Sequence, residues 1–457
     1  MDKKKKKNIV VFVVTVHDRY VEDIRRYAQE YGREYRIMWL WDSKLKKPDA
    51  EKNYDIFVEC DFSKSWKIAE ALLPYQSELL AITCRTEQNI ARFAQVIPHV
   101  PYLRTPTTES LRWATDKYEM RKRLKLFDAK NTPKFTWVKH NTKQERARVI
   151  EKVQFPMIVK PASLAGSLFV TICYHEDELE KAFRVLFSKL KKAYTTNSRK
   201  EVPKVIAEEY MEGDLYSIDS YVNARGDVYH CPLVRQKTAR DIGHDDFYNY
   251  LQITPTALKS STIERAQKVA ETAIHALGLR SVTAHVELMK VDDEWKVVEV
   301  GPRCGGARDV LHKLSCDINH TMNDIAIRIP RKPLVPKKCK GYAAYMKYFA
   351  DKEGLIVETK GIKKIESLES FHNININKKV GDRAIFARNG GRSIFNLFLY
   401  NADRSKLLAD IRRIEQTVEV KVQYGRNGGS KFTKKKVAKK SVKKTVKKVT
   451  KPAAQKK

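Results

Sequence analysis

The chain has 457 residues, of which 42% are hydrophobic, and a formal net charge of +34 at pH 7. This length predicts about three domains, and the hydrophobic content is ample for sizeable cores. No apolar run approaches the roughly 18 residues that a membrane-spanning helix needs, so the composition favours a large soluble protein.

Residues 8–104 predict an open α/β domain. Four apolar runs predict strands, at residues 9–16, 35–41, 55–59 and 79–84. Helical stretches separate them, and strand–helix alternation is typical of a parallel sheet. The run at 9–16 follows a basic N-terminus, as in a signal peptide, but no small-residue cleavage site comes after it. We therefore expect a first buried strand.

Two lysines come next in distinctive settings. Lys117 lies in a helix predicted over 107–127, and Lys160 ends an apolar strand that begins near residue 155. The turn after that strand contains small residues, namely Ser163, Gly166 and Ser167. Lysine ammonium groups and the backbone N–H groups of such a turn are suited to binding phosphate.

An apolar strand from residue 205 then opens into an acidic bend that contains Glu208, Glu209, Tyr210 and Met211. Further along, a basic strand carries Arg235 and Lys237, and a glycine loop follows it. These two cations are candidates for contact with phosphate or with a substrate carboxylate. A solvated, lysine-rich edge strand is the alternative interpretation.

Two glutamates, Glu287 and Glu299, lie in alternating segments that predict a hairpin with loop residues 292–294. That loop length would place the two glutamates directly opposite each other, where like charges repel. A divalent cation would neutralise them, and carboxylate oxygens suit magnesium. A loop of two or four residues would instead place Val298 or Val300 opposite Glu287, and a solvated edge hairpin is the alternative.

The residues around this hairpin add to the candidate site. Arg303 follows the second strand, in the run Arg303-Cys304-Gly305-Gly306. His285 shares a face with Glu287 in the predicted register. It could orient substrate or act as a base, although a histidine that only makes hydrogen bonds at the edge of the site is the favoured alternative. Cys304 is expected to pack as a small apolar residue.

The seven cysteines of the chain are an odd number and include no Cys-x-x-Cys pair. This usage predicts a reducing, cytoplasmic location and argues against a zinc site or a disulfide framework. The C-terminal tail is lysine-rich, with thirteen lysines and no acid between residues 431 and 457. Such a segment is expected to be disordered in isolation and to bind nucleic acid or an anionic membrane without sequence preference. A solvated tail that aids solubility is the alternative.

In their order, the two lysines, the Gly–Ser turn, the acidic bend, the diacidic hairpin and the arginine resemble the ATP-grasp superfamily. That group includes D-alanine–D-alanine ligase, biotin carboxylase, carbamoyl phosphate synthase and bacterial L-amino acid ligases. The segment 299–306 is closest to the amino-acid-ligase and carboxylase branches. The resemblance implies a three-domain architecture of α/β and α+β type, comprising an N-terminal open parallel α/β domain at 8–104, a two-lobed ATP-grasp domain at 105–335, a small C-terminal α+β domain at 336–425 and the tail at 426–457.

The same resemblance implies roles for individual residues. Lys117 and Lys160 would contact the ATP phosphates, together with the turn at Ser163, Gly166 and Ser167, and the bend Glu208–Met211 would receive adenine. Glu287 and Glu299 would hold Mg²⁺, with Mn²⁺ as an alternative metal, and Arg303 would be catalytic. Lys237 is a further catalytic candidate, and Arg235 and His285 are substrate candidates.

Three positions depart from the family's pattern. Many relatives have asparagine, a third metal ligand, where Gly301 stands, and many have a ribose-binding glutamate at the position of Leu215. Asp214 could replace that glutamate, but it would point to the opposite face if a strand has already begun there. The turn after Lys160 carries one glycine where relatives often have more. These departures bear on nucleotide choice and rate more than on the fold.

The resemblance implies an ATP-dependent, magnesium-dependent ligase that activates a carboxylate as an acyl phosphate, joins it to an amine, and releases ADP and phosphate. The partners would be a small-molecule carboxylate and an amine. Two alternatives stay open at this point. One is a nucleotide-binding ATP-grasp protein without ligase chemistry, whose basic tail binds nucleic acid or membrane. The other is an ATP-dependent carboxylase that uses bicarbonate. The oligomeric state is not predicted.

Overall fold

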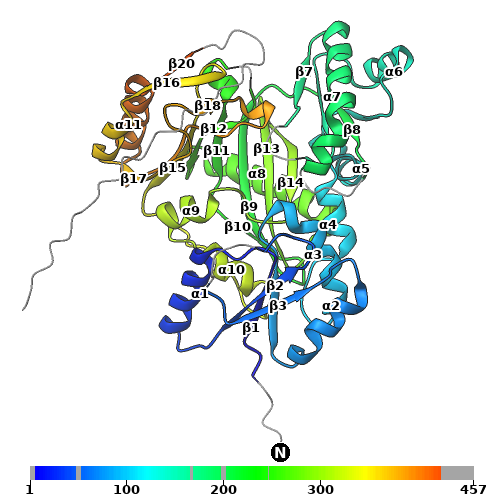
Figure 1. Ribbon diagram of the computed structural model, residues 1–457, viewed down its shortest axis with the longest axis vertical. Helices are drawn as coiled ribbons and strands as arrows, with labels where there is room; N and C mark the ends of the chain where they lie inside the picture. Colours follow the sequence, from blue (N-terminus) through cyan, green and yellow to red (C-terminus); the bar gives the residue numbers. More distant parts are fainter. Residues whose placement is uncertain (1–5, 48–52, 165–167, 197–201, 245, 424–457) are drawn as a thin grey trace, which may run out of the picture.

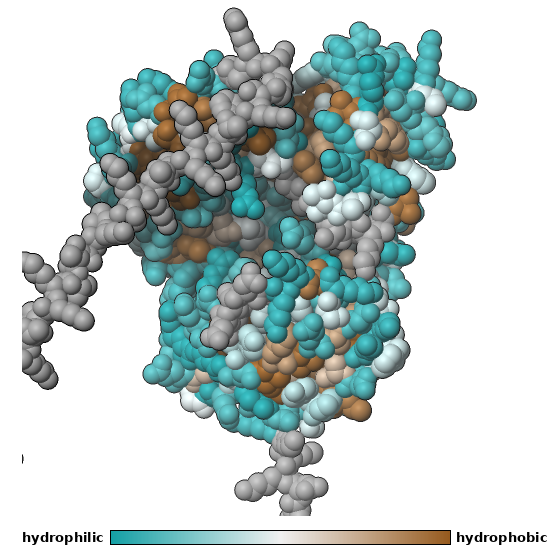
Figure 2. Space-filling model, viewed as in Figure 1, coloured by the Kyte–Doolittle hydropathy of each residue, from teal (hydrophilic) through white to brown (hydrophobic). Residues whose placement is uncertain are grey.

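The computed structural model describes residues 6–47, 53–164, 168–196, 202–244 and 246–423. Three lobes surround a central sheet (Figure 1), with the N-terminal domain below, one small lobe at the upper right and the C-terminal elements at the upper left. Hydrophilic residues cover most of the face shown in Figure 2, and the region between the two upper lobes is hollowed. The lysine-rich tail lies outside the described residues, so the structure does not test the prediction of its disorder or its contacts.

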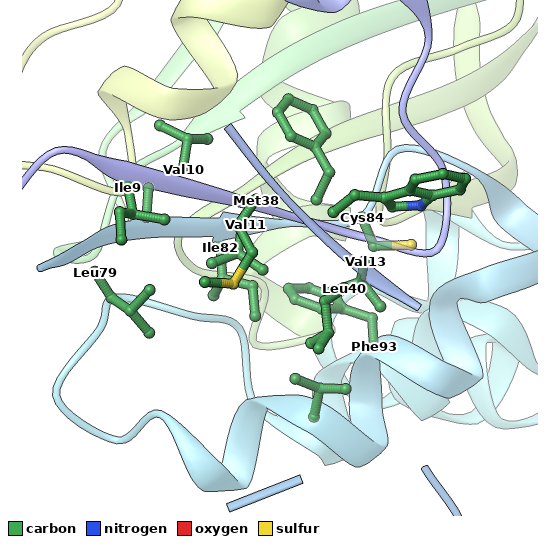
Figure 3. Close-up of a cluster of buried hydrophobic side chains, with 14 of the residues drawn as sticks. Ile9, Val10, Val11, Val13, Met38, Leu40, Leu79, Ile82, Cys84 and Phe93 are labelled. Carbon is green, nitrogen blue, oxygen red and sulfur yellow. The ribbon is translucent and has the colours of Figure 1, made fainter. Parts of the chain in front are cut away.

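The N-terminal domain is a parallel sheet of order β3-β2-β1-β4, as its strand–helix alternation predicted. Its strands are β1 (Ile9–Val13), β2 (Arg36–Asp42), β3 (Ile56–Cys60) and β4 (Leu79–Thr83), and its helices are α1 (Asp18–Glu30), α2 (Ser65–Leu72) and α3 (Ile90–Val96). All five residues of β1 are buried. Figure 3 shows why this strand is apolar throughout, because side chains from β2, β4 and α3 pack around it.

The helix predicted over 107–127 is in fact two helices, α4 (Thr108–Thr115) and α5 (Lys117–Phe127). Asp116 separates them in an extended conformation, and its carboxylate accepts hydrogen bonds from the backbone N–H groups of Tyr118 and Glu119. This is an N-cap, which Asp favours strongly. The break makes Lys117 the first residue of α5, and its own N–H donates to the carbonyl of Ala162 at 2.9 Å.

The small lobe at the upper right of Figure 1 carries an antiparallel sheet of order β5-β8-β6-β7. Its strands are β5 (Phe135–Val138), β6 (Met157–Pro161), β7 (Thr171–Cys173) and β8 (Val205–Glu209), and its helices are α6 (Lys143–Val153) and α7 (Glu176–Thr196). Leu179, Phe183 and Leu186 of α7 are buried in the core of this lobe. Lys160 is therefore held near the end of a rigid strand.

The central sheet has nine strands, eight of them in the order β14-β13-β9-β11-β12-β15-β19-β17, with β10 (Val228–His230) paired to β9. The eight are β14 (Glu294–Gly301), β13 (Val282–Val291), β9 (Asp214–Val222), β11 (Val234–Thr238), β12 (Asn249–Thr254), β15 (Tyr342–Tyr348), β19 (Phe395–Asn401) and β17 (Phe371–Ile376). Helices α8 (Ser260–Ala276) and α9 (Arg308–Cys316) pack on this sheet, whereas α10 (His320–Ala326) contributes to the core of the N-terminal domain. Strands β15, β17 and β19 come from the expected C-terminal domain and extend this sheet, so the two regions share one sheet.

The remaining C-terminal elements are α11 (Arg404–Thr417) and a three-stranded sheet of order β18-β16-β20, made of β18 (Arg383–Ala384), β16 (Gly354–Lys360) and β20 (Glu419–Gln423). They pack on the strands that end the central sheet. Among the described residues, no helix combines the length and the low charge needed to cross a bilayer.

A disulfide joins Cys316, the last residue of α9, to Cys339. The prediction against disulfides is therefore wrong for this pair. The cysteine count carries no information about the fold that brings these two residues together. The backbone N–H groups of Lys340 and Gly341 both donate to the carbonyl of Ser315, so the segment before β15 returns against the end of α9.

Candidate active site

A cavity of about 510 Å³ lies between the small lobe and the central sheet. Charged side chains from both parts line it, including Lys117, Lys160, Glu208, Glu287, Glu299 and Arg303. The structure thus brings together the two lysines, the diacidic hairpin and the arginine that the sequence singled out. His285, Glu209, Tyr210 and Met211 also line the cavity.

Glu287 and Glu299 are directly opposed across β13 and β14, as predicted, but for a different reason. The hairpin loop has two residues, Asp292 and Asp293, because Val291 pairs with Glu294. That register alone would place Val298 opposite Glu287. A β-bulge between Glu287 and Leu288 restores the pairing by inserting one extra residue into β14. The predicted loop length is therefore wrong, and the predicted pairing is confirmed.

Arg121 of α5 binds two backbone carbonyls of β14 at this bulge. Its Nη1 donates to the carbonyl of Val297 at 2.6 Å, and its Nη2 donates to that of Val298 at 2.8 Å. Arg121 also binds Glu208 of β8 through two hydrogen bonds, of 2.8 and 3.2 Å. One buried guanidinium thus connects α5, the small lobe and the bulge that aligns the two glutamates.

Glu208 is 2% exposed and holds a second cation, because Lys160 Nζ lies 2.6 Å from its carboxylate. Burial would raise the pKa of Glu208, but Arg121 and Lys160 lower it to about 2. Burial lowers the pKa of Lys160, and Glu208 opposes that shift. The sequence placed Glu208 in an adenine-binding bend. In the structure it lies in β8 as the counter-ion of two buried cations.

Lys117 pairs with Glu299, which is more exposed to solvent than Glu208. Its Nζ donates to Glu299 Oε1 at 3.0 Å and to the carbonyl of Leu164 at 3.1 Å. Burial alone would lower the pKa of Lys117, but the neighbouring Glu299 raises it. The side chain of Glu299 is 32% exposed, so this ion pair faces the cavity and water.

His285 lies between two acids. Its Nδ1 is 3.3 Å from both carboxylate oxygens of Asp219, and its Nε2 is 3.4 Å from Glu287 Oε1. Burial would lower the pKa of His285, but Asp219 and Glu287 raise it. Burial would raise the pKa of Glu287, yet the hydrogen bond and charge of His285 hold it below its usual value. A Cβ atom on Gly305 would lie 2.5 Å from His285 Nδ1, so only glycine fits above this ring.

Arg303 reaches the cavity from the strand end after β14 and pairs with the N-terminal domain. Its Nε donates to Glu87 Oε2 at 2.9 Å. Glu87 lies just after β4, and sequence reasoning missed it because 216 positions separate it from Arg303. Asp219 was missed for a similar reason: it lies in the middle of the buried strand β9 and contacts His285 of the neighbouring strand β13.

The cavity also has apolar lining residues, which include Ile158, Val170, Leu215 and Met289. Leu215 faces the cavity, whereas Asp214 pairs with Arg235 at 2.8 Å on the exposed surface. Neither Asp214, the candidate for ATP, nor Arg235, the candidate for substrate, is among the cavity's lining residues, because β9 has begun at Asp214 and turns its side chain outward.

Lys237 and Ser163, two further candidate site residues, do not line the cavity. Lys237 is exposed and is not among the cavity's lining residues, since Gln236 takes the inward position on β11. Ser163 is buried, and its backbone N–H donates to the hydroxyl of Tyr194 at 3.3 Å, so it does not line the cavity either. Gly166 and Ser167 lie outside the described residues.

The donor set fits a hard divalent cation. Two carboxylates face each other across a hairpin, and one is a third exposed to the cavity. Within the described residues, Lys117 contacts Glu299 and His285 contacts Glu287. Magnesium prefers such oxygen ligands and keeps water or phosphate as its other ligands. Lys117 and Lys160, placed at the same cavity, would meet those phosphates.

Residues 153–310 match the family described as the ATP-grasp domain. Alanine–anticapsin ligase of Bacillus subtilis (strain 168) is 26% identical over 222 residues, which are 46% of this chain and 44% of that protein. The uncharacterized protein y4rH of Sinorhizobium fredii is 23% identical over 287 residues, which are 62% of this chain and 56% of that protein. The chain thus spans about half the length of the curated relatives it matches.

Solved structures show the same fold. The L-amino acid ligase from Bacillus licheniformis superposes with a TM-score of 0.69 at 17% identity, covering 92% of this chain and 100% of that one. N5-carboxyaminoimidazole ribonucleotide synthetase from Thermotoga maritima superposes with a TM-score of 0.61 at 15% identity, covering 91% and 100%. At these identities the likeness establishes the fold.

Proposed function

Because the chain belongs to the ATP-grasp superfamily, we propose that it is an ADP-forming ligase that activates a carboxylate as an acyl phosphate and joins it to an amine. The observation that carries the proposal is the direct opposition of Glu287 and Glu299 beside Lys117, in a cavity that also contains Lys160 and Arg303. Carboxylates for a metal, cations for phosphates and a guanidinium for an oxyanion are the groups this chemistry needs.

In the first step, an oxygen of the substrate carboxylate attacks the γ-phosphorus of ATP, and the bond to the β-phosphate oxygen breaks to release ADP. Lys117 and Lys160 bind the phosphate oxygens and keep the reacting atoms in line. Mg²⁺ held by Glu287 and Glu299 would neutralise the charge that develops on the phosphates. Arg303 lies beside these carboxylates and donates to the transferring group.

In the second step, the amine nitrogen attacks the acyl carbon, and phosphate leaves as the new C–N bond forms. The amine loses a proton in the same step. The guanidinium of Arg303 stabilises the oxyanion of the tetrahedral intermediate, as a preorganised donor does in a site with little water. His285 keeps Glu287 in position through its bonds to both Asp219 and Glu287.

The variant Glu299→Gln tests this proposal, because it keeps the shape of the side chain and removes the metal-binding charge. We expect magnesium-dependent ADP release, measured with a panel of amino acids and small carboxylates, to fall at least about 100-fold, since metal stabilisation of phosphoryl transfer is worth several kcal/mol. Calorimetric titration with Mn²⁺ should show weakened binding in the same variant. Near-normal ADP release would refute the metal assignment.

Glu294→Gln is the matched control, because Glu294 begins the same strand but is exposed and lies away from the cavity. It should behave as wild type. Two other outcomes point to the alternative functions. Nucleotide binding without ADP release under any condition would indicate a binding protein, and ADP release with bicarbonate and no amine would indicate a carboxylase.

A further inference from the structure

Three side chains outside the proposed active site converge in a way that suits a metal ion. Cys304 directly follows Arg303, Asp309 lies in the first turn of α9, and His320 is the first residue of α10. Cys304 Sγ lies 3.6 Å from Asp309 Oδ1 and 3.4 Å from His320 Nδ1, and the ligand atoms of all three side chains lie within 4.8 Å of one another. None of the three lines the cavity of the proposed active site.

The spacing of these atoms matches a tetrahedral zinc site. Zn–S bonds of about 2.3 Å and Zn–N or Zn–O bonds of about 2.1 Å, at tetrahedral angles, place the sulfur about 3.6 Å from each other ligand atom. The observed distances of 3.4 and 3.6 Å are close to this value. A hydrogen bond from the thiol spans a similar distance, so the surroundings of each ligand are needed to tell the two apart.

A chain of hydrogen bonds fixes the tautomer of His320. His312 Nε2 lies 3.2 Å from the carbonyl of Pro232, which only accepts, so the neutral ring of His312 carries its proton on Nε2. His312 Nδ1 then accepts from His320 Nε2 at 2.8 Å, and the lone pair of His320 is therefore on Nδ1, the atom near Cys304. Metal-binding histidines characteristically donate their other ring N–H to a partner in this way.

The other contacts of these ligand atoms are ones that an ion replaces or retains. The hydroxyl of Tyr221 donates to His320 Nδ1 at 2.7 Å, so an ion at that nitrogen replaces one hydrogen bond between neutral groups. Asp309 is oriented by two arginines, with Arg85 Nη2 at 2.8 Å from Oδ1 and Arg19 Nη2 at 3.1 Å from Oδ2. A carboxylate accepts about four hydrogen bonds, so Oδ1 keeps a lone pair for the ion. Carboxylates at metal sites are usually hydrogen-bonded in turn.

A second cavity gives an ion access to this group. The cavity has a volume of about 230 Å³ and lies among α1, α9 and α10, which are neighbours in Figure 1. Asp309 and His320 both line it. Its volume is sufficient for several water molecules, so water is available for the fourth position of a tetrahedral site.

Cys231, His312 and His320 form a second group whose ligand atoms lie within 4.8 Å, and all three are buried. An ion there would break the hydrogen bond between the two histidines, and neither Cys231 nor His312 lines the second cavity. Of the five free cysteines, all of which the structure describes, only Cys304 is partly exposed. The group that contains Cys304 is therefore the better candidate, and Cys231 provides a matched control.

From these observations we infer that Cys304, Asp309 and His320 form a second metal site, which prefers Zn²⁺ to Mg²⁺. Thiolate and imidazole ligands favour zinc, whereas Glu287 and Glu299 offer only oxygen atoms. Binding deprotonates the thiol and releases its proton to solvent, and the thiolate offsets one charge of the ion. The ligands come from a loop and two helices, which is why the absence of a Cys-x-x-Cys pair in the sequence argued against zinc.

The role of this site is to hold the loop that carries Arg303. The carbonyl of Cys304 accepts a hydrogen bond from Arg303 Nη1 at 3.1 Å. An ion that ties Cys304 to α9 and α10 thus fixes the backbone group to which the guanidinium is bonded. The zinc is structural in this role and takes no part in the proposed reaction.

Titration with Co²⁺ tests the inference, because this ion adopts the same coordination as zinc and absorbs light. A thiolate ligand gives Co²⁺ a charge-transfer band in the near ultraviolet, and tetrahedral geometry gives it intense visible bands. A site made only of oxygen atoms lacks the charge-transfer band. The full-length protein is stripped of metal with a chelator and titrated without added thiols, as wild type, as Cys304→Ala and as the control Cys231→Ala.

We expect wild type and Cys231→Ala to develop the charge-transfer band with stoichiometric Co²⁺. Stoichiometric Zn²⁺ should abolish the band, and a large excess of Mg²⁺ should leave it unchanged. In Cys304→Ala the band should be absent, and the affinity for Zn²⁺, measured by competition with a chromophoric chelator, should fall more than about 100-fold, since loss of an outer-shell partner alone costs about 10- to 100-fold. Zn²⁺ should raise the melting temperature of wild type but not of Cys304→Ala.

The absence of a charge-transfer band in wild type would overturn the inference, as would a band that persists in Cys304→Ala or that Mg²⁺ abolishes. A band that disappears in Cys231→Ala and persists in Cys304→Ala would place the ion at the buried group instead. If Cys304→Ala does not fold, Cys304→Ser, which keeps a polar side chain of similar size, takes its place with the same expected spectrum.

Discussion

The two lysines of the cavity have carboxylate partners of opposite kinds. Lys160 faces Glu208, which is 2% exposed and is also bound by Arg121 through two hydrogen bonds. Lys117 faces Glu299, whose side chain is 32% exposed and which lies directly opposite Glu287. The first partner is enclosed on all sides by protein, and the second is open to ligand. In the proposed function, Glu208 therefore keeps its two cations, and Glu299 exchanges Lys117 for a metal ion.

The buried ion cluster around Glu208 also supports the position of Glu299. Arg121 is completely buried and donates to the carbonyls of Val297 and Val298, at the bulge that sets Glu299 opposite Glu287. Glu208 in turn fixes the guanidinium of Arg121. The buried cluster of Glu208 and Arg121 thus holds the register of the hairpin. That register places Glu299 opposite Glu287. Loss of Glu208 should therefore be felt both in stability and at the metal site.

The largest effect is expected for Glu208→Gln, which leaves two buried cations without their anion. Breaking a buried ion cluster in this way lowers the free energy of unfolding by about 3–5 kcal/mol. Urea denaturation followed by circular dichroism measures the change. Glu299→Gln is the comparison variant, and its free energy of unfolding should change by less than about 1 kcal/mol because water solvates the open pair.

A similar loss of stability in both variants would contradict the distinction between an enclosed and an open partner. The affinity for Mn²⁺ provides a second test, of whether Glu208 also affects the position of the bulge. Glu208→Gln keeps both of the proposed metal ligands, Glu287 and Glu299, so any weakening of Mn²⁺ affinity in a folded Glu208→Gln sample reports a displaced bulge.

The pH dependence of stability provides a second test of the buried partner, Glu208. The pKa of Glu208 is lowered from 4.5 to about 2 in the folded protein. A carboxylate with a depressed pKa stabilises the fold above its unfolded value, and this contribution is lost as the pH falls through the folded value. The difference in unfolding free energy between wild type and Glu208→Gln should therefore be constant above pH 5 and shrink from about pH 4.5 toward pH 2.

Urea denaturation at a series of pH values measures that difference. Glu299→Gln, assayed in parallel, provides the baseline for the acid response of the rest of the protein. A difference between wild type and Glu208→Gln that stays unchanged down to pH 3 would show that Glu208 is not held ionised by Arg121 and Lys160.

The sequence predicted those parts of the site that local patterns determine. Lys160 ends an apolar run, and the alternation around Glu287 and Glu299 identifies a hairpin. The break at Asp116 also has a local signal, because Asp is a favoured N-cap, and the predicted single helix overlooked it. The same alternation places Asp214 outward once β9 is known to begin at that residue.

What the sequence could not provide depends on long-range contacts. The bulge that aligns Glu287 with Glu299 is satisfied by Arg121, which lies 176 positions before Val297. Counting residues in the loop gave the correct pair only because an error in loop length and an unforeseen bulge compensated each other. Glu87 likewise became a site residue only through its contact with Arg303, which no local pattern records.

The smallest effect on stability, and the clearest separation of stability from binding, is expected for Lys117→Met. Glu299 would lose its lysine but keep its solvation, so the free energy of unfolding should change by less than about 1 kcal/mol. Affinity for magnesium and a non-hydrolysable ATP analogue should fall about 10- to 100-fold, because a charge-assisted bond to phosphate is lost. Lys122→Met is the control, since Lys122 lies on the same helix, is half exposed, and contacts Glu119 and the ring of Tyr118 on the surface. If Lys117→Met destabilises the protein by several kcal/mol, then Lys117 belongs with Lys160 as part of the enclosed framework, and the open pair is not exchangeable.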